Sequence, residues 1–145
     1  MSRIAVLVAA LCAWPGVTQQ TAKLAGTAIA EAARADVRME ATLIVTAEEE
    51  SNVLPRIQLG QCRPPRGKHR GECDWGLQGP QARGFWQLQR PAADSRAEWN
   101  ALLGLRQENV TAGAHVAARV FRRGFARCGT LEGGIAMYAT GKSCS

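Results

Sequence analysis

The chain has 145 residues, of which 46% are hydrophobic and 21% are charged, a composition typical of a globular protein with one domain and one sizeable core. It contains no internal repeat and no low-complexity tract, which excludes a repeat array and a low-complexity chain. The formal net charge of +6 favours an anionic partner, which could be nucleic acid, anionic lipid or an acidic cell-wall polymer.

The N-terminal sequence MSRIAVLVAALCAWPG predicts a secretory signal peptide over residues 1–18. Arg3 supplies the positive charge, the apolar run over residues 4–14 is too short to span a bilayer, and a Pro-Gly pair ends the run. The alternative is that this run forms a buried first helix of the domain. On the first interpretation residues 19–145 form the mature domain, which has no stable membrane span and is exported to the periplasm or the outside of the cell.

The cysteine count agrees with export. The chain contains Cys12, Cys62, Cys73, Cys128 and Cys144, and removal of a signal peptide leaves the last four. Four thiols in an exported chain predict two disulfides, for which three connectivities are possible. We favour the pairs that are local in sequence, Cys62–Cys73 and Cys128–Cys144.

The first half of the predicted domain contains two helices and a long loop. Residues 20–35 are rich in alanine and other good helix formers. Asp36 is expected to cap a second helix, which Pro55 ends. Residues 60–84 contain six glycines and three prolines and predict a long loop, which is usually functional or cross-linked in a compact domain.

The second half is expected to be helical as well. Residues 94–105 predict a helix with Asp94 as its N-cap. Residues 109–127 have the clearest apolar stripe, and Gly129 is a typical stop signal after them. Shorter elements are expected at residues 85–89, as a strand or a helical turn, and at residues 135–138, as a helical piece. The predicted fold is therefore mainly α-helical, with a long disulfide-tied loop.

Three consecutive glutamates stand at the end of the second predicted helix. At about 100° per residue, Glu50 lies in line with Leu43 and Ala47, Glu49 lies nearly opposite them, and Glu48 lies to one side. A carboxyl group held against apolar surface has a raised pKa, which suits a general acid near neutral pH. The alternative is that the helix frays here and water surrounds all three carboxylates.

Four sequence segments resemble those of the lytic transglycosylase and goose-type lysozyme superfamily. ESNVLP (residues 50–55) resembles its E-S-x-x-x-P segment, in which the glutamate ends a helix. ARGFWQLQRP (82–91) is similar to its G-L-M-Q or G-L-W-Q segment, NVTAGAHVAARVF (109–121) to its long central helix, and GGIAMYATG (133–141) to its A-L-x-x-Y-N-A-G segment. The four segments occur in the same order as in that superfamily and with roughly its spacing.

The resemblance implies a lysozyme-like fold that cleaves the β-1,4 bond between N-acetylmuramic acid and N-acetylglucosamine in peptidoglycan glycan strands. It implies that Glu50 is the single general acid and base, that the C6 hydroxyl of the sugar replaces water, and that no cofactor takes part. A hydrolytic lysozyme would need a second carboxylate, for which Asp74 and Glu72 are the candidates. The chain departs from the family pattern at Ala139, where asparagine is usual, and in the length and basic character of residues 60–84.

By the same resemblance, Ser51, Gln87, Tyr138 and Trp86 are expected to contact the substrate or to position Glu50. Tyr138 in particular is expected to hydrogen-bond Glu50. The alternatives are that Gln87 and Tyr138 make core hydrogen bonds and that Ser51 is an ordinary helix-end hydroxyl.

Other interpretations remain beside this one. A hydrolytic lysozyme and a non-catalytic exported glycan-binding module both fit the sequence. Trp75 and Trp86 are expected to flank a sugar-binding groove, whereas Trp99 is expected in the core. The basic run over residues 63–70 either contacts wall phosphates or nucleic acid or is a solvated loop, and we expect no nucleic-acid partner. A zinc site has the weakest support, since disulfide pairing suits an exported chain better; it would use Cys62, His69, Cys73 and Asp74.

Overall fold

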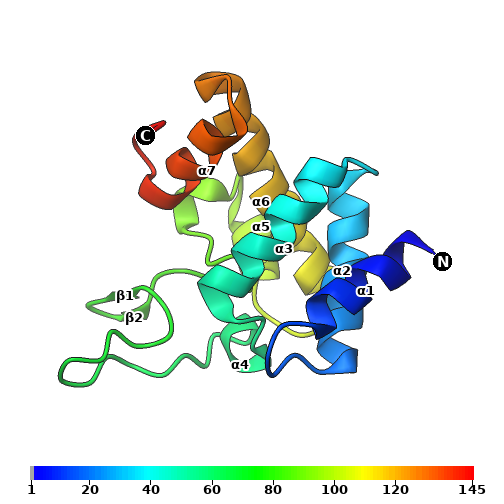
Figure 1. The fold of residues 1–145 in the computed structure, drawn as a ribbon. Helices are drawn as coiled ribbons and strands as arrows, with labels where there is room; N and C mark the ends of the chain where they lie inside the picture. The colour runs from blue at the N-terminus through cyan, green and yellow to red at the C-terminus, as the bar shows by residue number, and fades with distance from the viewer. Residues whose placement is uncertain (1) are drawn as a thin grey trace.

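The computed structural model describes residues 2–145, and 59% of the chain is helical (Figure 1). The α-helices are α1 (Arg3–Cys12), α2 (Gln19–Ala33), α3 (Val37–Ser51), α4 (Pro55–Gln58), α5 (Arg96–Ala101), α6 (Gln107–Cys128) and α7 (Leu131–Thr140). A short antiparallel hairpin pairs β1 (Trp75–Gly76) with β2 (Gly79–Pro80), and a 3-10 turn, η1, spans Arg90–Ala92. The prediction of a mainly helical fold is confirmed. Within residues 2–145, no helix has the length and apolar character needed to cross a membrane.

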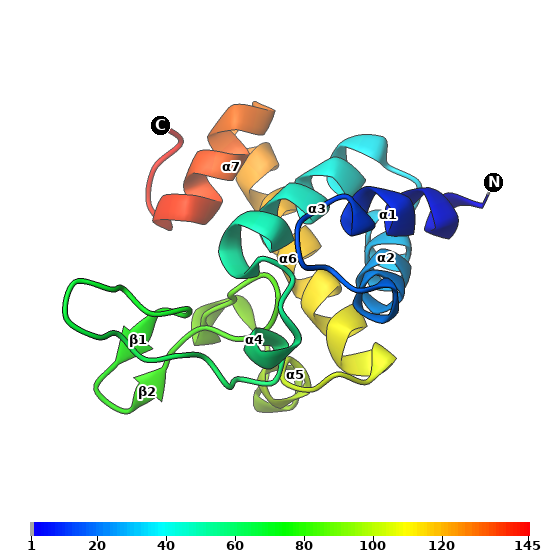
Figure 2. The ribbon, with the colours of Figure 1, turned by 60° about the horizontal axis from the view of Figure 1, so that its bottom comes forward.

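Helix α6 is the element around which the other helices assemble. Helices α2, α3 and α7 all pack against it (Figures 1 and 2). Its inner face carries Ala114, Ala117 and Ala118, which are fully buried, and such small side chains let neighbouring helices approach closely. Helix α2 contributes Ala25 and Ile29 to the same core, and burial of a side chain the size of Ile29 stabilises the fold by about 2 kcal/mol.

Two predicted helix boundaries are confirmed in atomic detail. The side chain of Asp36 accepts hydrogen bonds from the backbone N–H groups of Arg38 and Met39, at 3.0 and 3.3 Å, and so caps α3. Gly129 ends α6 with a φ of +74°, a left-handed conformation that glycine adopts without steric cost. Both boundaries follow from local backbone chemistry, which is why the sequence was sufficient to predict them.

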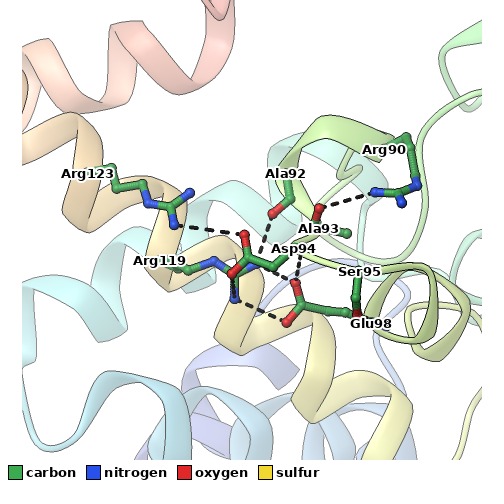
Figure 3. Close-up of polar contacts among 8 residues, drawn as sticks. All are labelled: Arg90, Ala92, Ala93, Asp94, Ser95, Glu98, Arg119 and Arg123. Atoms are coloured by element: carbon green, nitrogen blue, oxygen red, sulfur yellow. Dashed lines mark hydrogen bonds and ion pairs between the residues drawn. The ribbon is translucent and has the colours of Figure 1, made fainter.

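The prediction that Asp94 caps α5 is wrong. Ser95 is the N-cap, and its Oγ accepts a hydrogen bond from the backbone N–H of Glu98 at 3.0 Å. The carboxylate of Asp94 instead lies 3.4 Å from Arg119 and 3.9 Å from Arg123 on α6 (Figure 3). Arg119 also pairs with Glu98, whose pKa it lowers, and donates to a carbonyl group of η1 at 2.9 Å. This network holds η1 and α5 against α6.

Helix α1 packs against α2 and belongs to the core. Its inner face buries Leu7, Val8 and Leu11. Arg3 donates from Nε to Oε2 of the buried Glu40 at 2.7 Å. This packing favours the alternative in which the N-terminal apolar run is the first helix of the domain. Cleavage of a signal peptide stays a prediction, which the intact mass of the exported protein tests, since the cleaved form would lack residues 1–18.

Helix α7 is longer than the predicted piece at residues 135–138. It starts at Leu131 and includes Gly133 and Gly134, both buried. A Cβ atom at Gly134 would overlap the ring of Phe125, so the glycine lets α7 lie directly on α6. Glycine pairs disfavour helices in isolation, and here the contact with α6 outweighs that propensity.

Candidate active site

A pocket with a volume of about 760 Å³ lies between the C-terminal end of α3, the loop before β1, the turn after β2, and helices α6 and α7. Parts of the chain that are far apart in sequence therefore supply its walls. The lining residues include Glu50, Pro65, Arg70, Glu72, Asp74, Trp75, Ala82, Gln87, Leu88, Gln89, Ala92, Val120, Met137, Tyr138, Ala139 and Thr140. The pocket thus brings together most of the residues that the sequence singled out.

Glu50 is the second-to-last residue of α3, and the backbone turns sharply directly after it. Asn52 and Val53 both have a φ of +53°. This conformation is common for an Asn that ends a helix but rare for a β-branched residue such as Val53, so the backbone at Val53 is strained. Ser51 stabilises this turn, because its Oγ donates to the carbonyl of Ala47 at 2.8 Å and accepts from the N–H of Val53 at 3.2 Å. Ser51 is buried and does not line the pocket, which favours the helix-end alternative over a contact with substrate, while a role in positioning Glu50 stays a prediction.

The exposure of Glu49 agrees with the helical periodicity, but Glu50, which was predicted at the buried edge, is exposed as well, and Glu48 is half-buried. Leu43 and Ala47 are fully buried, and Glu50 follows them in the same line to the end of α3, where it lines the pocket and stays open to solvent. Glu50 keeps contact with solvent through the pocket, but neighbouring atoms remove part of its hydration. This desolvation, with a smaller contribution from the charge of Glu49, raises the pKa of Glu50. The pKa of Glu48 is raised for the same two reasons, but Glu48 does not line the pocket.

Tyr138 lies in the pocket wall but does not make the expected hydrogen bond to Glu50. Its hydroxyl donates to the backbone carbonyl of Trp86, and its ring stacks on Phe121 with 4.2 Å between ring centroids. Burial, with a contribution from the charge of Glu50, raises the pKa of Tyr138. The hydroxyl is therefore neutral and ties α7 to the turn that carries Trp86.

Trp86 is fully buried and offers no exposed face to a sugar, contrary to the expectation. Its Nε1 donates to the carbonyl of Leu43 at 2.9 Å, and its ring lies against Gly113, where an added Cβ would come within 3.3 Å of it. Trp86 thus links α3 to α6 beneath the pocket. Trp75 does line the pocket, as expected for a groove residue, and Trp99 packs against the core as expected.

Gln87 lies in a tight turn rather than in a strand or helix. Its φ is +47°, and its Nε2 donates to the carbonyl of Gly84 at 2.9 Å. Its Oε1 is buried and has no hydrogen-bond partner within residues 2–145. The bond to Gly84 supports the interpretation of Gln87 as a residue that makes structural hydrogen bonds. Its place in the pocket wall supports the interpretation that it contacts the substrate.

Gln58 is an important residue that the sequence analysis did not identify. It is fully buried at the end of α4, and its Oε1 accepts from the backbone N–H of Phe85 at 2.8 Å. Its Nε2 donates to the carbonyls of Leu102 and Gly104, at 3.0 and 2.9 Å. One side chain therefore fixes the pocket turn to the segment after α5. A single glutamine in a four-residue helix carries no periodic signal, so nothing in the pattern indicated it.

Two further carboxylates line the pocket and differ in their surroundings. Glu72 pairs with Arg56, with 2.9 Å between Nε and Oε1, and also accepts from the backbone N–H of Arg63 at 2.8 Å. The bond from Arg56 is the main cause that lowers the pKa of Glu72 to about 2, so Glu72 is a fixed anion with a structural task. Asp74 is exposed and accepts only one side-chain hydrogen bond in the described chain, from Gln89 at 3.0 Å. Asp74 therefore remains the candidate second carboxylate.

The two favoured disulfides are present, Cys62–Cys73 and Cys128–Cys144, and Cys12 is a free thiol. The first closes the loop before β1, and the second ties the segment after α7 to the end of α6, so both support walls of the pocket. Cys62 and Cys73, the two thiolates of the zinc site considered from the sequence, are joined to each other in the first disulfide. Within residues 2–145, no group of three or more His, Cys, Asp or Glu side chains could hold a metal ion.

No protein-family model, curated protein or solved structure matches this chain.

The pair between Glu72 and Arg56 should make stability depend on pH. The pKa of Glu72 is lowered from 4.5 to about 2, so its contribution is complete above pH 4.5 and is lost as the pH falls toward 2. Glu72→Gln should therefore lower the free energy of unfolding on the order of 1 kcal/mol at pH 7 and have little effect near pH 2. Urea unfolding at several pH values measures this, with Glu132→Gln as an exposed control. An equal loss of unfolding free energy near pH 2 and at pH 7 would contradict the lowered pKa of Glu72.

Proposed function

We propose that the protein is an exported lytic transglycosylase that cleaves the β-1,4 bond between N-acetylmuramic acid and N-acetylglucosamine in peptidoglycan. The observation that carries the proposal is the state of the pocket carboxyls. Glu50 and Glu72 both line the pocket, and the pKa of Glu50 is raised, whereas that of Glu72 is lowered by Arg56. A single carboxyl group that is protonated more easily than usual suits a reaction that needs one group as acid and then as base.

In the first step, protonated Glu50 donates its proton to the glycosidic oxygen. The bond from C1 of the muramic acid to that oxygen breaks, the N-acetylglucosamine leaves with a hydroxyl group, and positive charge develops at C1. In the second step, the Glu50 carboxylate takes the proton of the C6 hydroxyl of the same muramic acid, and O6 bonds to C1. The product is a 1,6-anhydro sugar, no water is consumed, and Glu50 is protonated again.

The remaining pocket residues fit a sugar polymer. The ring of Trp75 supplies an apolar surface, and Gln87, Gln89 and Asp74 offer polar groups for sugar hydroxyls. Tyr138 acts through the backbone that it anchors rather than through Glu50 itself. Two disulfides support an oxidising location such as the periplasm or the outside of the cell, where peptidoglycan lies.

Hydrolysis is the second candidate, and Asp74 is the observation in its favour. Its carboxylate lines the same pocket as Glu50 and is not engaged by an arginine within the described residues. A water molecule activated by Asp74 would then take the place of the C6 hydroxyl. A non-catalytic glycan-binding module is the third candidate, in which the same pocket binds a strand without cleaving it.

The masses of the products separate these candidates. Purified peptidoglycan is incubated with the protein, and the released fragments are weighed. Fragments that are one water lighter than hydrolysis products support the transglycosylase, and hydrated fragments support the lysozyme and direct attention to Asp74. Binding without any released fragment would overturn the enzymatic proposal and leave the binding module.

A further inference from the structure

The loop closed by Cys62–Cys73, here called the basic hairpin (residues 62–73), carries an unusual concentration of unpaired positive charge. Its side chains include Arg63, Arg66, Lys68 and Arg70, all exposed. Within residues 2–145, no carboxylate lies within ion-pair distance of any of these four side chains, whereas Arg56 and Arg119 each have an acidic partner. The positive charge of the basic hairpin is therefore free to bind an external anion.

The basic hairpin is built as a defined structure. Arg66 and His69 exchange two backbone hydrogen bonds, at 3.0 and 2.8 Å, around a tight turn. Further along, a Cβ atom at Gly71 would lie 2.9 Å from the backbone oxygen of Arg63, so only glycine allows the two arms to cross this closely. Glu72 fixes the end of the basic hairpin that joins the rest of the fold, through its bonds to Arg56 and to the backbone N–H of Arg63. These contacts fix the backbone of the basic hairpin, so binding a ligand there costs little backbone freedom.

The basic hairpin also continues the pocket that contains Glu50. A second pocket of about 580 Å³ is lined by Arg63, Pro64, Arg66, His69, Arg70, Gly71 and Glu72. Arg70, Gly71 and Glu72 belong to the walls of both pockets. In Figures 1 and 2 the segment between α4 and β1 extends away from the helices, beside the β1–β2 hairpin. A ligand in the large pocket therefore meets the positive charges directly beyond it.

We propose that the basic hairpin binds the carboxylates of the peptides that branch from the glycan strand, so that the preferred substrate is a peptide-bearing strand. This inference rests on the proposed function. In peptidoglycan the peptide branches from the muramic acid, the sugar whose bond Glu50 would cleave, so its carboxylates lie within reach of a site that shares a wall with the pocket. Arginine suits this ligand because its guanidinium group can bind a carboxylate through two parallel hydrogen bonds.

The composition of the basic hairpin argues against nucleic acid. Proteins that bind single strands place aromatic side chains among the basic ones, and no Phe, Tyr or Trp occurs within residues 62–73. A phosphodiester polymer of the cell wall would also be attracted by the positive charge, but nothing fixes its phosphates beside the cleaved bond. Both ligands are included as outcomes of the test.

The test compares two triple variants with the same change in net charge. Arg63→Gln/Arg66→Gln/Lys68→Gln removes three of the four positive charges of the basic hairpin and keeps Arg70, which lines the pocket of Glu50. Arg34→Gln/Arg38→Gln/Arg127→Gln removes three exposed arginines that make no side-chain hydrogen bond or ion pair within the described chain. Each is assayed on glycan strands that carry peptides and on the same strands after an amidase has removed the peptides. The hairpin variant should lose about fivefold to tenfold in kcat/KM on peptide-bearing strands only, and the control variant should lose little on either. Equal losses on both substrates, or none, would overturn the proposal.

Binding measured without turnover separates this inference from the proposed function. In the Glu50→Gln background, strand binding is measured with and without peptides, with a phosphodiester wall polymer, and with single-stranded DNA. Binding that needs both the peptides and the three replaced side chains of the basic hairpin supports the inference even if the protein cleaves no glycan. Hairpin-dependent binding that is as strong for the phosphodiester polymer or for DNA as for the peptide-bearing strand would overturn it, even if cleavage through Glu50 is established.

Discussion

Replacement of Glu50 by glutamine should lower the rate of glycan cleavage about thousandfold while strand binding changes little. Glutamine has nearly the same shape, but it cannot supply a proton to the leaving oxygen or remove one from the C6 hydroxyl, and general acid–base catalysis contributes about 10²- to 10⁴-fold. Single-turnover rates and dissociation constants on purified strands measure the two effects separately. Glu49→Gln is the matched control, since Glu49 is adjacent, has the same side chain and is exposed outside the pocket.

The pH dependence of this reaction has a defined sign. Glu50 must be protonated for the first step, so cleavage should weaken as the pH rises above the raised pKa of Glu50. Because the pKa of Glu50 is raised in the folded protein, its carboxylate destabilises the fold once the pH exceeds the pKa of this group in the unfolded chain. Glu50→Gln should therefore be at least as stable as the wild type at neutral pH. A variant that lost activity because it had unfolded would instead be less stable than the wild type. Thermal unfolding of both proteins at pH 7 therefore distinguishes lost chemistry from lost structure.

Replacement of Gln58 by alanine should cause the largest loss of stability among substitutions of polar residues in this chain. It would leave the buried N–H of Phe85 and the carbonyls of Leu102 and Gly104 without their side-chain partner. Unsatisfied buried groups cost about 1–3 kcal/mol each, so a total loss of about 3 kcal/mol or more is expected. Urea unfolding measures this, with Gln61→Ala as the control, because Gln61 is exposed and makes no side-chain hydrogen bond within residues 2–145.

A second variant of Gln58 tests the direction of its hydrogen bonds. The substitution Gln58→Glu keeps the acceptor for Phe85 but loses both donors, and at neutral pH it brings a carboxylate against two carbonyl oxygens. Its stability should therefore recover in part as the pH falls and the carboxyl group is protonated. If Gln58→Ala were as stable as Gln61→Ala, the side chain would not fix the pocket turn. If Gln58→Glu were no less stable than the wild type at neutral pH, the donors would contribute nothing.

The features that the sequence predicted well depend on local chemistry. The cap at Asp36, the stop at Gly129 and the two short-range disulfides each involve residues close together in the chain. The helix face that carries Glu50 followed from periodicity over two turns, because the helix extends without interruption to Ser51, whereas the exposure of Glu50 did not. Local rules were therefore sufficient for the main helices and for the direction of Glu50, but not for its burial.

The features that the sequence predicted poorly depend on contacts between distant segments. Trp86 was expected at the surface, but its indole donates to α3 and lies against α6, and no local pattern specifies either partner. Tyr138 likewise bonds to the carbonyl of Trp86, 52 residues earlier in the chain, in place of Glu50. The full length of α7 depends on the fit of Gly134 against Phe125. In each case tertiary packing decides between alternatives that local propensity leaves open.

The most direct test of the central claim is a digest of one peptidoglycan preparation by the wild type, Glu50→Gln and Glu49→Gln in parallel, with the released fragments weighed by mass spectrometry. The wild type and Glu49→Gln should release 1,6-anhydro fragments, and a folded Glu50→Gln should release none. Release of the same fragments by Glu50→Gln would contradict the central claim, because cleavage would then not depend on the carboxyl group at the end of α3.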